Sequence, residues 1–127
     1  MTYYVDGYTT YSNPSFTGGG FTVATEGNNI ITKSILKENF TNNEAELCAV
    51  NYAAQICDIR DIIITDSEVM ISWLDREHLD KKKRGRKDLD PLKLETIKLL
   101  EDKYIELIWS PREKNLAGIY NEKTFNS

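Results

Sequence analysis

The sequence has few of the residues on which disulfide-bonded or histidine-dependent proteins rely. It has two cysteines and one histidine among 127 residues. Cys48 and Cys57 are nine residues apart in one expected helix, so they face opposite sides and cannot pair with each other. We therefore expect reduced thiols and a cytoplasmic protein. With His78 alone, a histidine metal site or a His-based catalytic triad is not expected.

Long hydrophobic runs and an excess of positive charge are also missing. No apolar stretch is long enough to cross a bilayer, and the first residues lack the basic and apolar regions of a signal peptide, so no membrane association is expected. The net charge is -4, so nucleic-acid binding would require a local basic patch. The length fits one domain over residues 1–127, which we expect to be a monomer.

Hydrophobic periodicity predicts an α/β fold in the order βββαβαβα. Strands are expected at 2–8, 21–25, 30–36, 61–65 and 104–109, and helices at 41–57, after 67, from 90 and from 115. The first three strands are joined by short turns and form an antiparallel meander. Crossover connections then make the later strands parallel, so the sheet is mixed.

The first helix begins with a capping box. Thr41 would cap the helix and Glu44 would reach back to its backbone N–H. An apolar stripe follows at helical spacing, formed by Ala45, Cys48, Ala49, Tyr52, Ala53 and Ile56. Glu46 lies on the flank of this stripe. Unlike Glu44, it is too far from the helix start for capping to explain its presence.

Three carboxylates stand out by position. Asp6 lies inside the first strand and is followed by Gly7, where another backbone or a ligand can approach closely. Asp66 ends the buried fourth strand, at the kind of edge where α/β folds place their sites. Each has a simpler interpretation, since Asp6 can face water on an edge strand and Asp66 can be a helix N-cap.

Parallel pairing of the first and fourth strands would place Asp6 beside Asp66, and the first helix would add Glu46. Such a cluster of oxygen ligands suits a hard cation such as Mg²⁺. Two such ions about 4 Å apart can activate water and stabilise the leaving oxygen in phosphodiester cleavage.

Four motifs, in order along the chain, resemble the ribonuclease H family. They are Val5-Asp6-Gly7 with the glycine-led second strand, Thr41-Asn42-Asn43 with Glu46-Leu47, Ile64-Thr65-Asp66-Ser67, and Trp109-Ser110-Pro111-Arg112-Glu113 with Asn115 and Ala117. The resemblance covers nearly the whole chain. It implies a five-stranded mixed sheet, three antiparallel strands then two parallel, flanked by helices. It also implies two-ion hydrolysis, with Mg²⁺ or alternatively Mn²⁺, of RNA paired with DNA.

The resemblance also implies roles for individual residues. Asp6, Glu46 and Asp66 match the family's first three metal-binding carboxylates. Thr41 matches a phosphate contact, while Asn42 and Asn43 match contacts to the minor groove, where the 2′-hydroxyl identifies RNA. Further substrate contacts are expected from Gly7, Arg112, Lys82, Lys83 and Arg84.

One position departs from the family pattern. The family has its fourth carboxylate, an Asp, directly after the alanine of the last motif. This chain has Gly118 at that position. Glu122 lies one helical turn further on and is a candidate substitute; Asn115 and Asn121 are weaker ones. Without a substitute, the second ion binds poorly, activity falls, and Mn²⁺ is preferred over Mg²⁺. The alternative is a domain that binds hybrids without cleaving them.

The basic run Lys81–Lys87 is the one charge block in the sequence. It is interpreted as a phosphate-contacting loop, with a solvated loop or a nuclear-targeting signal as the alternatives. A nuclease of the wider superfamily that acts on DNA is a third functional hypothesis. The Thr41-Asn42-Asn43 motif favours RNA recognition over it.

Overall fold

A computed structural model describes residues 1–27, 29–75 and 87–125 of the chain. The strands are β1 (Thr2–Thr9), β2 (Gly19–Thr25), β3 (Ile30–Ile35), β4 (Ile62–Thr65) and β5 (Glu106–Trp109). The helices are α1 (Asn42–Ile56), α2 (Glu68–Trp73), α4 (Asp90–Asp102) and α5 (Leu116–Phe125), with short 3₁₀ turns at Lys87–Leu89 and Arg112–Lys114. No described helix is long and apolar enough to cross a membrane.

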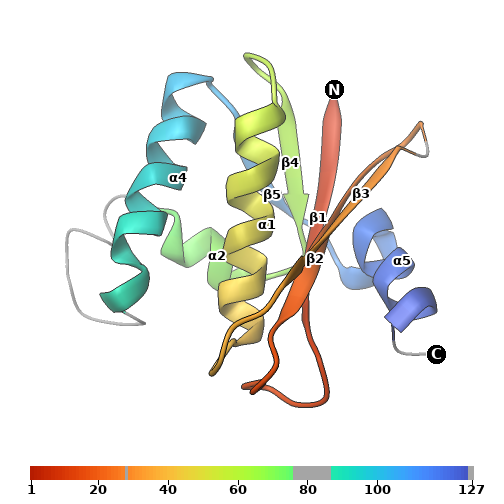
Figure 1. Ribbon diagram of the computed structural model, residues 1–127. Helices are drawn as coiled ribbons and strands as arrows, with labels where there is room; N and C mark the ends of the chain where they lie inside the picture. The colour runs from red at the N-terminus through yellow and green to blue at the C-terminus, as the bar shows by residue number, and fades with distance from the viewer. Residues whose placement is uncertain (28, 76–86, 126–127) are drawn as a thin grey trace.

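The five strands form one mixed sheet in the order β3-β2-β1-β4-β5. β1 pairs antiparallel with β2, and β2 with β3, whereas β4 pairs parallel with both β1 and β5. This is the predicted fold class. α1 and α4 lie on one side of the sheet and α5 on the other (Figure 1).

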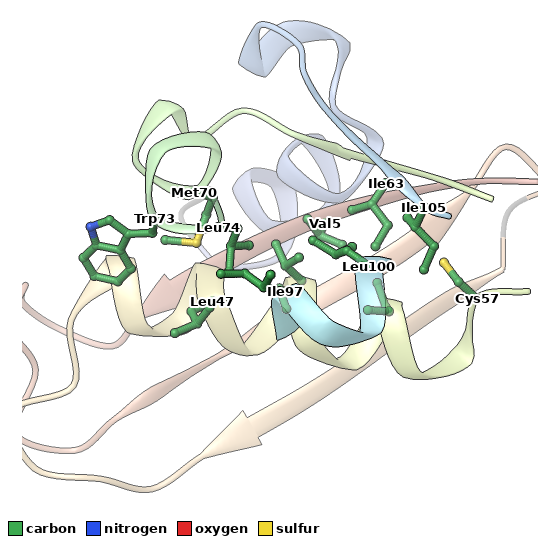
Figure 2. Close-up of a cluster of buried hydrophobic side chains, with 14 of the residues drawn as sticks. Val5, Leu47, Cys57, Ile63, Met70, Trp73, Leu74, Ile97, Leu100 and Ile105 are labelled. Carbon is green, nitrogen blue, oxygen red and sulfur yellow. The ribbon is translucent and has the colours of Figure 1, made fainter. Parts of the chain in front are cut away.

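The hydrophobic core lies between the sheet and the helices on the α1 side. Side chains from β1, β4, α1, α2 and α4 meet there in one layer (Figure 2). The fully buried members include Val5, Leu47, Val50, Ile63 and Met70. This core is wider than the predicted α1 stripe, because α1 packs against both the sheet and α4. Ile56, predicted to be part of the stripe, is 37% exposed.

Both ends of α1 are held by side chains. At the first, the Thr41 hydroxyl accepts from the backbone N–H of Glu44 at 3.1 Å, which confirms the predicted cap. The Glu44 carboxylate makes an ion pair with Lys37. At the other end, Lys103 Nζ donates to the last carbonyls of the helix region, those of Ala54, Gln55 and Cys57, at 2.8–2.9 Å. The helix that carries Glu46 is therefore fixed at both termini.

α4 begins at Asp90, as predicted, whereas one strand boundary was wrong. The N-cap of α4 is Leu89, which has no side-chain capping bond, and Pro91 occupies the first turn. The fifth strand begins at Glu106 rather than Tyr104, because Tyr104 has a positive φ of 52° and turns the chain between α4 and β5.

Candidate metal centre

The parallel pairing of β1 and β4 builds the base of the site. Val5 and Thr65 are partners in the register, so the next residues along each strand, Asp6 and Asp66, become neighbours. The Asp6 side chain is completely buried. The alternative of an exposed carboxylate on an edge strand is therefore wrong, since β1 lies in the middle of the sheet.

α1 lies directly against β1 at Gly7. A Cβ on Gly7 would be 2.4 Å from the backbone carbon of Ala45 and 2.5 Å from the nitrogen of Glu46. Only glycine permits this approach. The Gly7 N–H donates to Glu46 Oε1 at 2.9 Å, which directs the carboxylate toward Asp6 and Asp66. Of the two possibilities for Gly7, the structure shows the approach of another backbone.

Asp6, Glu46 and Asp66 form a compact acidic cluster. Each offers an oxygen, and these oxygens lie within 4.8 Å of one another. Glu46 is only 7% exposed, and its Oε2 has no hydrogen-bond donor among the described residues. A buried carboxylate oxygen without a donor is costly unless a cation satisfies it. The oxygen-only ligand set fits a hard divalent cation such as Mg²⁺ or Mn²⁺.

Asp66 does not cap the helix that follows it. The N-cap of α2 is Ser67, whose hydroxyl accepts from the Met70 N–H at 3.3 Å. The interpretation of Asp66 as a helix N-cap is therefore wrong, and its carboxylate is available to the cluster.

Residues near the end of the chain complete the surroundings of Asp6. Asn121 Nδ2 donates to Asp6 Oδ2 at 2.9 Å, and Asn115 Nδ2 donates to the carbonyl of Val5 at 2.9 Å. Both asparagines are fully buried. Arg112 Nη1 lies 3.3 Å from Asp6 Oδ1 and 3.3 Å from Asp66 Oδ2. The sequence interpretation assigned Arg112 to substrate contact and did not anticipate this bridge.

Gly118 faces the cluster, as the motif spacing predicted. A Cβ there would be 3.2 Å from Asp66 Oδ2 and 3.7 Å from carbons of Arg112. Glu122, the suggested substitute for the missing carboxylate, is exposed and is not among the clustered carboxylates. Asn121, one residue earlier on α5, reaches Asp6 instead, but it does so as a hydrogen-bond donor.

The expected substrate-contact residues lie around the start of α1. Asn42 is exposed, its backbone N–H donates to Asn13 Oδ1, and its amide oxygen accepts from Thr9. Asn43 is half-buried, and the hydroxyl of Thr41 is engaged in capping. Lys82, Lys83 and Arg84 lie outside the described residues.

The cluster shifts the acidity of its members. Burial raises the pKa of Glu46 well above its ordinary value, and the Asp6 carboxylate raises this pKa further. The hydrogen bond from the Gly7 N–H has the opposite effect and lowers it. Burial and Asp6 raise the pKa of Asp66 to about 6, although the Arg112 guanidinium opposes this shift. Without a metal ion, the folded protein therefore holds protons here that an unfolded chain would release.

This shift predicts a pH dependence of stability. The folded-state pKa of Asp66 lies above its ordinary value of 3.8, so its contribution to stability is present below about pH 4 and is lost as the pH rises to about 6. In EDTA, Asp66→Asn should gain stability relative to wild type over this range, by up to about 3 kcal/mol. Urea unfolding at several pH values measures this difference. Asp58→Asn, the same change at an exposed residue, is the matched control, and an equal trend in both variants would contradict the assignment.

Comparison with known proteins agrees with the fold. The RNase H family model matches residues 1–120. Among solved structures, an N-terminal RNase H domain from Mycobacterium tuberculosis, determined as a fusion with maltose-binding protein, has the same fold. Its TM-score is 0.62 at 21% identity, covering 91% of this chain and 90% of that one. No curated protein sequence matches significantly.

The chain belongs to the RNase H family. This confirms the resemblance drawn from the four motifs. Domains of this family are nucleases that act on RNA–DNA hybrids and are typically dependent on divalent metal ions.

Proposed function

We propose that this protein is a metal-dependent endonuclease that hydrolyses the RNA strand of RNA–DNA hybrids. The observation that carries the proposal is the acidic cluster of Asp6, Glu46 and Asp66, which contains a buried Glu46 oxygen without a donor. Asp6 belongs to β1, Asp66 directly follows β4, and Glu46 belongs to a helix held by side chains at both ends. The cluster therefore sits on rigid elements, as a site of fixed ligand geometry requires.

Each residue of the cluster has a distinct task. Asp6 offers a carboxylate oxygen from β1, and Asn121 fixes the orientation of this carboxylate. The Gly7 N–H fixes the orientation of the Glu46 carboxylate. Asp66 supplies the third carboxylate from the position directly after β4. When bound, Mg²⁺ or Mn²⁺ would supply an activated water and stabilise the leaving oxygen, yielding 3′-hydroxyl and 5′-phosphate ends.

Recognition of RNA is assigned to the start of α1. The side chain of Asn42 is exposed on the first turn, and Asn43 follows it. Side-chain amides of this kind can donate to and accept from base edges and the 2′-hydroxyl in the minor groove. Thr41 contributes by fixing the helix start. Lys82, Lys83 and Arg84 remain proposed phosphate contacts.

A second candidate is a hybrid-binding domain with weak or no catalysis. Gly118 favours it, because the fourth carboxylate is absent and the described carboxylates supply no replacement. The two candidates share the fold and the substrate, and they differ in whether the phosphodiester bond is broken.

Cleavage of a labelled RNA–DNA hybrid, in Mg²⁺ and separately in Mn²⁺, distinguishes them. Duplex RNA and duplex DNA of the same sequence test selectivity, and Asp6→Asn protein controls for contaminating nuclease. Cleavage of the hybrid by wild type alone supports the enzyme. Binding of the hybrid without cleavage in either metal would leave the binding domain, and cleavage of duplex DNA would indicate the wider superfamily.

Restoring the fourth carboxylate should increase activity. In Gly118→Asp, the new carboxylate would lie beside Asp66 and add an oxygen ligand to the site. We expect Mg²⁺-supported cleavage to rise about tenfold or more, which corresponds to about 1.4 kcal/mol of transition-state stabilisation, and any preference for Mn²⁺ to narrow. Steady-state cleavage rates measure this change. Gly118→Asn has nearly the same size without the charge and should not raise the rate; an equal gain in both variants would contradict the explanation.

A further inference from the structure

Arg112 places a positive charge inside the acidic cluster. Its Nη1 lies 3.3 Å from one oxygen of Asp6 and 3.3 Å from one oxygen of Asp66. The side chain comes from the 3₁₀ turn after β5 and remains 47% exposed, whereas the two carboxylates are 0% and 9% exposed. The guanidinium therefore covers the cluster from the solvent side.

Such a charge stabilises the cluster when no divalent ion is bound. Asp6 is fully buried, and the amide of Asn121 gives it a hydrogen bond but no positive charge. Among the described residues, Arg112 makes the ion pairs of both Asp6 and Asp66. A buried carboxylate group without a cation carries a desolvation penalty of several kcal/mol. The guanidinium reduces this penalty for two carboxylates at once.

Gly118 provides the space for this arrangement. The position of a Cβ at residue 118 is 3.7 Å from Cγ and 3.7 Å from Cζ of Arg112, and 3.2 Å from Asp66 Oδ2. A larger side chain would extend from this point into the volume beside the guanidinium. Glycine at position 118 therefore has two effects: the site lacks a fourth carboxylate, and there is room for a cation next to Asp66.

We propose that Arg112 is a tethered counter-cation of the acidic cluster, which neutralises the metal-free site and competes with the divalent ion for Asp6 Oδ1 and Asp66 Oδ2. The inference rests on the proposed metal-dependent function. It adds that metal binding must displace the guanidinium from these oxygens. Arg112 thereby raises the concentration of divalent ion needed to occupy the site. Its half-exposed side chain moves toward solvent when the ion binds.

Calorimetric titration with Mn²⁺, and separately with Mg²⁺, tests the competition without relying on catalysis. Arg112→Gln removes the charge and should bind Mn²⁺ about ten- to a hundredfold more tightly than wild type, because two charge-assisted hydrogen bonds no longer oppose the ion. Arg112→Lys keeps the charge but lacks the planar guanidinium. Its Mn²⁺ affinity should lie between those of wild type and Arg112→Gln. Lys98→Gln changes the net charge equally at an exposed pair with Asp102 on α4 and should shift the affinity less than about twofold at 0.15 M salt.

A second measurement uses the wild-type protein and so does not depend on a variant that folds. In ¹⁵N-labelled protein, the side-chain Nε resonance of Arg112 should shift during Mg²⁺ titration with the midpoint found by calorimetry. That of Arg60, which lies over the Tyr104 ring, should not follow this midpoint. An unmoved Arg112 resonance in a metal-bound protein would overturn the inference.

The outcomes separate this inference from the proposed function. Equal or weaker metal binding by Arg112→Gln, with normal binding by wild type, overturns only the counter-cation role. Failure of wild type, Arg112→Gln and Arg112→Lys alike to bind Mn²⁺ at millimolar concentration overturns both the inference and the metal-dependent nuclease.

Discussion

Replacing Asp6 with asparagine is expected to reduce cleavage of an RNA–DNA hybrid at least about a thousandfold, which corresponds to about 4 kcal/mol in the barrier. Asp6 has several partners in the site, since its carboxylate contacts Asn121 and Arg112 and lies close to Glu46 and Asp66. The amide is nearly the same size but carries no charge, and one of its two terminal atoms is a donor, so it cannot act as a bridging ligand. Initial rates in Mg²⁺ and Mn²⁺ measure the loss.

The fold should survive this change. The buried Asp6 charge is unfavourable beside the other carboxylates, so the melting temperature of Asp6→Asn in EDTA should equal or exceed that of wild type. Its affinity for the hybrid in the absence of metal should stay within a few-fold of the wild-type value. Asp58→Asn, the same substitution at an exposed residue, should retain full activity. Substantial cleavage by Asp6→Asn would place the catalytic centre elsewhere.

Replacing Gly7 with alanine is expected to cause a large loss of stability from a single added methyl group. The new Cβ would lie 2.4–2.6 Å from Ala45 and Glu46 atoms, and two of these three atoms are backbone, so no side-chain rotation relieves the clash. α1 must move away from β1, at a cost of about 3 kcal/mol or more. Thermal and urea unfolding would show a melting temperature lower by about 10 °C or more.

The same displacement should impair the site. Moving α1 lengthens the hydrogen bond from the Gly7 N–H to Glu46 and withdraws the Glu46 carboxylate from Asp6, so Mn²⁺ affinity should fall together with stability. Gly27→Ala is the matched control, because a Cβ on Gly27 would meet no atom closer than 3.9 Å. If the two alanine variants are equally stable, the close approach of α1 to β1 at Gly7 is incorrect.

The sheet and the base of the site could be predicted because each strand has its own local signal. Alternation and turn residues mark β1, β2 and β3, and a continuous apolar run marks β4. Once β1 and β4 are paired in parallel, the neighbouring positions of Asp6 and Asp66 follow from the register alone. The approach of Glu46 follows from the packing of α1 across Gly7.

The polar residues from the end of the chain could not be predicted in the same way. An asparagine inside a helix looks like a surface residue in the sequence, and the burial of Asn121 depends on the packing of α5 against β1 and β2. The prediction favoured Glu122, one position away, and gave Asn121 only as a weaker candidate. Positions three and four residues beyond Gly118 share one side of a helix, and the rotation set by tertiary packing decides which of them faces the site.

The exposure of aromatic side chains at the sheet edge depends on the strand order. Trp109 is 46% exposed because β5 is an edge strand. Its indole N–H donates to the carbonyl of Asp66 at 3.1 Å, so it still supports the chain beside the site. Trp73, by contrast, is buried in the core, where Lys93 Nζ lies 4.1 Å from the centre of its ring.

The separation along the chain between the carboxylates and their partners has a consequence for protein synthesis. All three acidic residues have been translated by residue 66, but Arg112 and Asn121 follow Asp6 by 106 and 115 residues. A ribosome-bound chain that has emerged only as far as β4 therefore has the acids without the amide that orients Asp6 and without the guanidinium that neutralises the metal-free cluster. The proposed nuclease acquires its working geometry only after residue 121 has left the ribosome, so an incomplete nascent chain would not cut hybrids.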